Sequence, residues 1–184
     1  MIALVNRNLK VYFRDKASVF FSLLAVIIIF LVYLLFLGDV WSQNLPQVEG
    51  VRPMMDSWIM AGLLAVTSMT TVMGAFGTMV DDRSHKLMKD FSASPVSRAS
   101  IVAGYELASF LVGLLMSLLA FVLAEVYIVM RGGVMLAPAG MFAMVGLIVL
   151  SSLCNTAMIS FVISFFSSQN AFGTASSILG TLVG

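Results

Sequence analysis

Residues 80–100 read VDDRSHKLMKDFSASPVSRAS, and this stretch decides how the rest of the chain is organised. It contains seven charged residues and the only histidine, His85, in a chain that is 60% hydrophobic and 10% charged. The apolar runs on both sides are too long for strands, which predicts an aqueous loop between two membrane spans. We call residues 81–100 the charged loop, and we expect it to be accessible to a soluble partner.

The composition excludes a water-soluble globular domain. About a quarter of the residues in such a domain are charged, far more than in this chain. The net charge of +1 gives no general attraction to nucleic acid, so no nucleic-acid partner is expected. The single cysteine, Cys154, lies in an apolar run and has no partner for an internal disulfide.

The predicted fold is an all-α polytopic membrane protein in the lipid bilayer, with an N-terminal interfacial helix, four complete transmembrane helices and the start of a fifth. An uncharged run of about 20 residues forms a helix about 30 Å long, which matches the hydrocarbon thickness. The last apolar segment is too short to cross, which predicts a chain truncated within that span. The predicted segments are the interfacial helix (1–17), first span (18–37), external loop (38–57), second span (58–80), charged loop (81–100), third span (101–130), fourth span (139–166) and start of the fifth span (171–184).

The N-terminal segment has helical periodicity. Its apolar residues fall on one face, at Ile2, Val5, Leu9, Tyr12 and Phe13. Its cations fall on the opposite face, at Arg7, Lys10 and Arg14. This pattern predicts a helix in the membrane surface with its cations among lipid phosphates. The alternative is a basic flank that only orients the first span.

The distribution of lysine and arginine predicts the orientation. The N-terminal segment and the charged loop each contain four, whereas the external loop and the turn after the third span each contain one. The positive-inside rule therefore places the N-terminus and the charged loop together in the cytoplasm.

The sequence shows no catalytic or metal-binding motif. There is no HExxH, GxSxG or P-loop, and all the aspartates lie outside the predicted spans. We therefore expect no enzyme activity, no metal and no bound cofactor in this chain. Any ATP would have to be hydrolysed by another chain.

Two glutamates, Glu106 and Glu125, fall within the third apolar run. A carboxylate in the bilayer is a functional hypothesis by default. The two residues are about 28 Å apart along the helix, so they cannot share a proton or an ion. The favoured interpretation is that they mark the two water interfaces, and their roles stay open.

Small and hydroxyl residues form stripes at helical spacing on three spans. The second span carries Thr67, Thr71, Gly74 and Thr78, for which helix packing and a substrate path are both open. On the third and fourth spans, with Gly113 and Ser160 among them, helix packing is favoured. Asn155 lies beside the stripe of the fourth span.

The charged loop itself reads as a short helix followed by a turn. Asp81 and Asp82 suit a helix N-terminus, where acidic side chains meet the positive end of the dipole. Leu87 and Phe91 stand four apart and form an apolar knob among cations, and Pro95 ends the helix. The alternative is a solvated connector lying on lipid headgroups.

The order of these segments resembles the permease subunit of type-2 ABC exporters, including bacterial drug-export permeases. Arg14-Asp15-Lys16 is similar to the family's usual Arg-Asp pair before the first span. Residues 94–98, Ser-Pro-Val-Ser-Arg, are similar to a common sequence after the coupling helix of the family. The family fold has six spans, and the resemblance covers all residues given.

The resemblance implies a permease that pairs into a homodimer or heterodimer and binds an ABC ATPase, which holds ATP and Mg. The residues expected to contact the ATPase are Asp82, Arg83, Lys86, Leu87, Lys89 and Phe91. The residues expected to line the substrate path are Thr67, Thr71, Thr78 and Asn155.

The expected function is therefore that of the membrane subunit of an ATP-driven exporter in the bacterial cytoplasmic membrane, moving a hydrophobic or amphipathic substrate. An ion-driven secondary transporter would need an ionisable group or a broken helix at mid-depth. A membrane anchor or immunity protein that binds a partner through the charged loop is the third possibility. The sequence does not identify the substrate.

Overall fold

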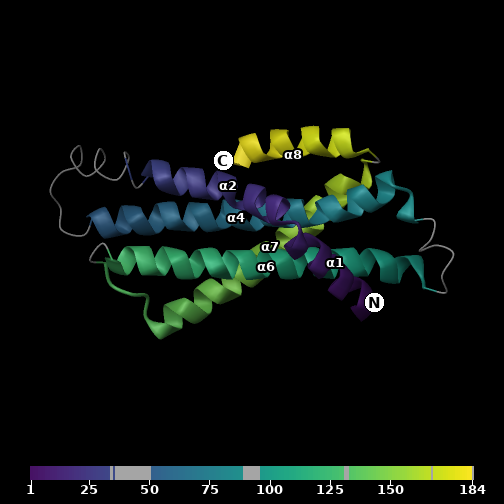
Figure 1. The fold of residues 1–184 in the computed structure, drawn as a ribbon. Coiled ribbons are helices and arrows are strands. Elements are labelled where there is room, and N and C mark those ends of the chain that lie inside the picture. The colour runs from purple at the N-terminus through teal and green to yellow at the C-terminus, as the bar shows by residue number, and fades with distance from the viewer. Residues whose placement is uncertain (34, 36–50, 89–95, 131–132, 167, 184) are drawn as a thin grey trace.

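The computed structural model describes residues 1–33, 35, 51–88, 96–130, 133–166 and 168–183. Helices are the only regular elements in these ranges, which confirms the all-α prediction (Figure 1). The helices are α1 (Ile2–Arg14), α2 (Lys16–Val32), α4 (Val51–Ser84), α6 (Arg98–Met130), α7 (Pro138–Ser164) and α8 (Gln169–Val183).

Helix α4 is the centre of the bundle. It packs against α2, α6, α7 and α8, and α1 lies across α4 and α6 (Figure 1). Val72, Phe76 and Val80 follow one face of α4 at four-residue spacing and are completely buried. They pack with Tyr105 of α6 and Ile159 of α7 in the main apolar core. This repeat of large apolar side chains fixes which face of α4 meets its neighbours.

Among the described residues, three helices are long and apolar enough to cross a membrane: Met54–Ser84 within α4, together with α6 and α7. Helix α2 is also apolar, but the predicted first span extends to residue 37, beyond the described part of the helix. Helix α8 has 15 residues and begins at Gln169, two residues before the start of the predicted segment 171–184.

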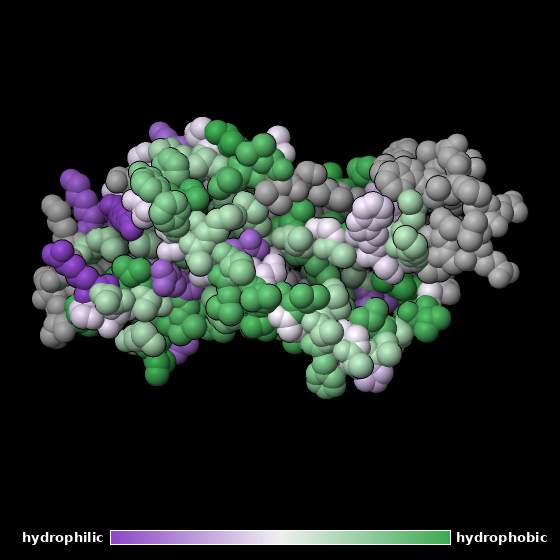
Figure 2. Space-filling view, turned by 180° about the vertical axis from the view of Figure 1, so that it is seen from behind, coloured by the Kyte–Doolittle hydropathy of each residue, from purple (hydrophilic) through white to green (hydrophobic). Residues whose placement is uncertain are grey.

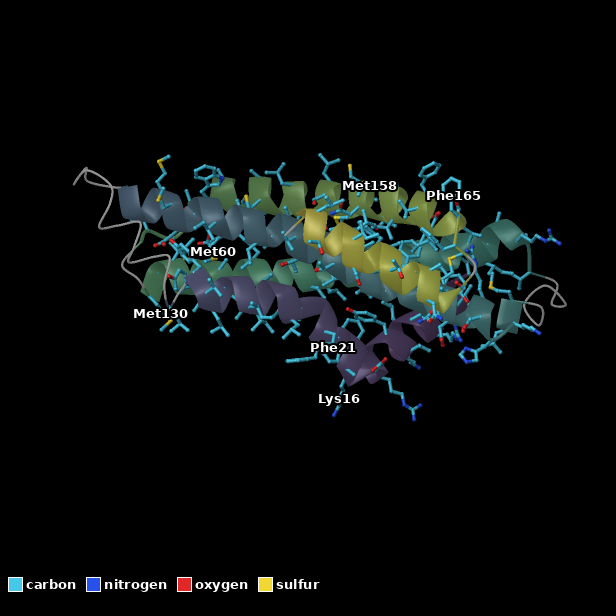
Figure 3. All side chains as sticks on the ribbon, turned by 90° about the horizontal axis from the view of Figure 1, so that it is seen from above. Lys16, Phe21, Met60, Met130, Met158 and Phe165 are labelled. Atoms are coloured by element: carbon cyan, nitrogen blue, oxygen red, sulfur yellow. The ribbon has the colours of Figure 1, made fainter. Side chains whose placement is uncertain are left out.

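Most of the charged side chains that the structure describes lie toward one end of the bundle (Figure 2), although Asp56 and Glu125 lie at the other end. The N-terminus and the ends of α4 and α7 lie together at this end (Figure 1). From behind, the surface along the bundle is mostly hydrophobic, and the hydrophilic residues cluster at the left, which is the same end (Figure 2). From above, Lys16 and Phe21 at the α1–α2 corner point away from the bundle (Figure 3). The arrangement places the N-terminus and the described parts of the charged loop, residues 81–88 and 96–100, at the same end (Figure 1).

The predicted helix start at Asp81 and Asp82 is wrong. Helix α4 continues through both residues to Ser84, so they lie in its last turn. At about 51 Å, α4 is longer than the hydrocarbon is thick, so it can carry these acids out of the apolar region. An acid at a helix C-terminus is unfavourable by itself, so a compensating partner is required.

Candidate functional site

One buried carboxylate ties three helices together at the base of the charged loop. Asp82 in α4 is only 4% exposed. The guanidinium of Arg7 in α1 donates to both carboxylate oxygens, with Nη2 at 2.9 Å from Oδ1, and the hydroxyl of Tyr105 in α6 donates to Oδ2. We call Arg7, Asp82 and Tyr105 the junction. It supplies the compensation that the acid needs at this end of α4.

The junction is partly shielded from solvent. The side chain of Asp82 is 6% exposed and that of Arg7 is 35% exposed. The hydrogen bond that Arg7 donates to Asp82 raises the pKa of Arg7 above its ordinary value, so the cation is favoured further. The carboxylate of Asp82 is buried within the chain, where it bonds to α1 and α6. Its contact with an ATPase stays a prediction.

Arg83, the next residue, links α4 to the end of α7. Its Nη1 donates to the carbonyl oxygens of Ile163 and Phe166, each at 3.3 Å. Cations favour the carbonyl end of a helix because the dipole is negative there. Two adjacent residues therefore connect the end of α4 with α1, α6 and α7.

Among the first residues after α4, the apolar side chain of Leu87 is exposed to solvent. Lys86 has a φ of 61°, in the left-handed region that ends a helix, and it is exposed. Leu87 is 38% exposed, whereas Met88 packs against the main core. Lys89 and Phe91, the other expected contacts, lie outside the described residues. Leu87 and Lys86 are thus the expected contact residues that the structure leaves accessible.

The threonines of the second span are packed between helices. Thr67 and Thr71 are completely buried, and each hydroxyl donates to a carbonyl of α4 itself, at 2.7 Å. Thr78 is half-buried and donates to Ala75 at 2.9 Å. These hydroxyls are therefore satisfied by carbonyl groups of their own helix. Their role in a substrate path stays a prediction.

Asn155 in α7 does meet α4. Its Nδ2 donates to Ser68 Oγ at 3.0 Å, and Ser68 lies 3.4 Å from the hydroxyl of Ser152. Ser68 and Ser152 are buried. Sequence reasoning missed Ser68, although it directly follows Thr67 of the stripe. Hydrogen bonds of this kind hold transmembrane helices together.

The buried face of the N-terminal helix shares Val5 and Tyr12 with the predicted apolar face and adds Asn8. Ile2 and Phe13 of the predicted face are exposed, and the placement of the helix in the membrane surface stays a prediction. Asn8 and Arg7 thus turn toward the bundle. Lys10 and Arg14, the other predicted membrane-surface cations, are exposed.

The two glutamates of α6 have separate partners. Glu125 is 8% exposed, and its Oε2 accepts from the backbone N–H of Leu136 at 3.3 Å. Glu106 is half-buried, and its Oε1 accepts from the hydroxyl of Ser160 in α7 at 2.8 Å.

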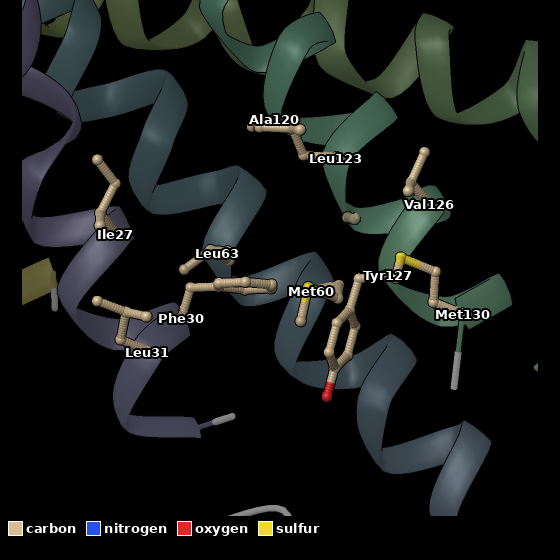
Figure 4. Close-up of a pocket in the computed structure, with 11 residues that line it drawn as sticks. Ile27, Phe30, Leu31, Met60, Leu63, Ala120, Leu123, Val126, Tyr127 and Met130 are labelled. Carbon is tan, nitrogen blue, oxygen red and sulfur yellow. The ribbon is translucent and has the colours of Figure 1, made fainter. Parts of the chain in front are cut away.

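An apolar groove lies between α2, α4 and α6 at the opposite end from the junction. Its volume is about 540 Å³, and its lining includes Phe30, Met60, Leu63 and Tyr127 (Figure 4). The rings of Phe30 and Tyr127 meet edge to face with centroids 5.2 Å apart. Met60 and Met130 mark this end of the bundle in the view from above (Figure 3).

These features define a polytopic all-α membrane protein whose helix ends are fastened by a polar junction. The family model of the ABC-2 type transporter matches residues 1–183, so the chain belongs to the ABC-2 type transporter family. It is therefore a multi-pass membrane permease component of an ABC transporter. No curated protein and no solved structure gives a significant match. Within the described residues, no group of three His, Cys, Asp or Glu side chains could hold a metal ion.

Proposed function

We propose that this chain is the membrane-spanning permease subunit of an ATP-driven exporter and couples to a separate ATPase through the charged loop. The ATPase holds ATP and Mg on the cytoplasmic side, and two permease chains enclose the path of a hydrophobic or amphipathic substrate. The membrane is the bacterial cytoplasmic membrane. Membership of the ABC-2 family supports this assignment, since its members normally pair with an ABC ATPase.

The observation that carries the coupling mechanism is the pair of adjacent residues at the base of the loop. Asp82 is bonded to α1 and α6, and Arg83 is bonded to the end of α7. A displacement of the loop by the ATPase therefore acts on α1, α4, α6 and α7 together. Since the helices are long and packed along their length, movement at this end tilts them as rigid bodies.

Leu87→Asp tests the contact with the ATPase. Leu87 is apolar and 38% exposed, and a charge there would be buried without a partner on docking. We expect this substitution to weaken nucleotide-dependent binding of the ABC ATPase partner by about tenfold or more. Binding is measured with both proteins purified, by pull-down and by titration.

Val134→Asp is the matched control. Val134 is also apolar and is 89% exposed, but it precedes α7 at the opposite end of the bundle. We expect it to leave ATPase binding unchanged. Equal binding by wild type and Leu87→Asp would refute the assignment of this loop as the contact.

A further inference from the structure

We infer that the chain has a binding site for an amphipathic cation between α6 and α7, with Glu106 as the counter-ion. The site is a groove of about 780 Å³, separate from the threonine stripe and from the junction. Its size falls in the range of ligand sites, and its walls are mainly apolar with a few polar groups. The ligand class is an ammonium or phosphonium ion that carries a bulky apolar body.

Although Met1 also lines the groove, no cation among the described residues lies within ion-pair distance of the carboxylate of Glu106. Its one hydrogen bond there comes from Ser160, which leaves Oε2 without a donor in this part of the chain. Ionisable residues within membrane spans are costly unless they pair with a charge or face a water-filled cavity. A half-buried carboxylate that faces a groove is thus suited to a cation from outside the chain.

The depth of the site also suits an amphipathic ligand. Glu106 lies about 12 Å from the start of α6, and Ser160 lies about 6 Å before the end of α7. The site is therefore close to the membrane interface at the junction end. Leu107, Phe110 and Phe161 extend the groove with apolar surface, and Thr156 adds a hydroxyl. A ligand can place its charge on Glu106 and its body among these side chains.

Tetraphenylphosphonium is the probe, because it is a permanent cation with four apolar rings. Its binding to the purified chain in dodecyl maltoside, an uncharged detergent, is measured by equilibrium dialysis. We expect Glu106→Gln to weaken binding about tenfold, since only the charge is removed. Glu125→Gln is the matched control on the same helix and is expected to bind as the wild type does. Triphenylphosphine oxide, which is neutral, should not distinguish the variants.

A second variant keeps the carboxylate and fills the site. Ser160→Lys places an ammonium beside Glu106, so tetraphenylphosphonium binding should again fall about tenfold. Helix content by circular dichroism checks that each variant is folded. Wild-type affinity in either Glu106→Gln or Ser160→Lys would overturn the proposal.

The cation can be a freely diffusing hydrophobic amine or the amine of a phospholipid. Added short-chain phosphatidylethanolamine separates the two sources. Displacement of the probe supports the site with a lipid amine as its ligand, and retention supports it with a free cation. The measurement needs no ATPase or nucleotide, so its failure would leave the proposed coupling through Leu87 unaffected.

Discussion

Asp82→Ala is expected to destabilise the bundle by about 2 to 3 kcal/mol, because it removes the shared acceptor of Arg7 and Tyr105. Removing one partner of a completely buried ion pair costs about 3 to 5 kcal/mol. The smaller value applies here because the side chain of Arg7 is 35% exposed, and solvent screens part of its charge. The free energy of unfolding in mixed micelles, followed by circular dichroism during titration with sodium dodecyl sulfate, measures the effect.

The neighbouring acid is the matched control. Asp81 pairs with His85 on the surface, where the two side chains are 54% and 68% exposed. Asp81→Ala should therefore change stability by less than about 0.5 kcal/mol. Equal losses in Asp81→Ala and Asp82→Ala would show that the junction contributes nothing beyond the charge of the helix end.

A double-mutant cycle separates the ion pair from the tyrosine bond. Arg7→Ala and Asp82→Ala remove the same interaction, so the double variant should lose less than the sum of the single losses. Tyr105→Phe removes one hydrogen bond and should cost about 1 to 2 kcal/mol. Additive losses from Arg7→Ala and Asp82→Ala would contradict the bonds between α1 and α4.

The membrane helices could be predicted from the sequence because their signal is local. Uncharged apolar runs longer than about 18 residues have few alternatives to a spanning helix. The predicted third and fourth spans, 101–130 and 139–166, differ from the bounds of α6 (Arg98–Met130) and α7 (Pro138–Ser164) by at most three residues. No local sequence pattern predicts the junction. Its bonds join residues 75 and 23 positions apart, and no periodicity links them.

The wrong prediction of a helix start at Asp81 and Asp82 has a physical cause. An acid pair that follows an apolar run suits either the start of a new helix or the end of the old one. Dipole energetics favour the start by less than about 1 kcal/mol at an exposed site. The hydrogen bonds that Arg7 and Tyr105 donate to Asp82 contribute more free energy than this dipole preference, so α4 continues to Ser84. Tertiary contacts therefore decide where the span ends and the charged loop begins.

The stripes of hydroxyl residues show a different limit of prediction from sequence, because the partners of the hydroxyl groups could not be predicted. A threonine in a helix can bond its own backbone or face a neighbour or a pore, and its sequence is the same in each case. Thr67 and Thr71 bond their own helix, whereas Ser68 meets Asn155 across the bundle. Only the positions of the partner helices distinguish these outcomes. The sequence could indicate which faces are polar but not what they meet.

Gly113→Leu is expected to destabilise the bundle by about 3 kcal/mol, at the upper end for overpacking. A Cβ atom at Gly113 would overlap Cγ2 of Val72, and it would lie 3.8 Å from both Ser152 Oγ and the Ser68 carbonyl oxygen. Helices α4, α6 and α7 therefore converge on this one position. Val72 is β-branched and completely buried, so it has little freedom to move aside.

Alanine variants give the sharper comparison, because glycine to alanine also gains up to about 1 kcal/mol of helix propensity. A Cβ atom at Gly146 in α7 would meet no other atom within 4 Å, so Gly146→Ala should gain part of that amount. Gly113→Ala should instead lose about 1 kcal/mol or more. Adding Val72→Ala removes the overlapping methyl groups, so this double variant should lose less than the sum of the single losses. If Gly113→Ala were as harmless as Gly146→Ala, α4 and α6 would not approach this closely, and the junction at their ends would need a different geometry.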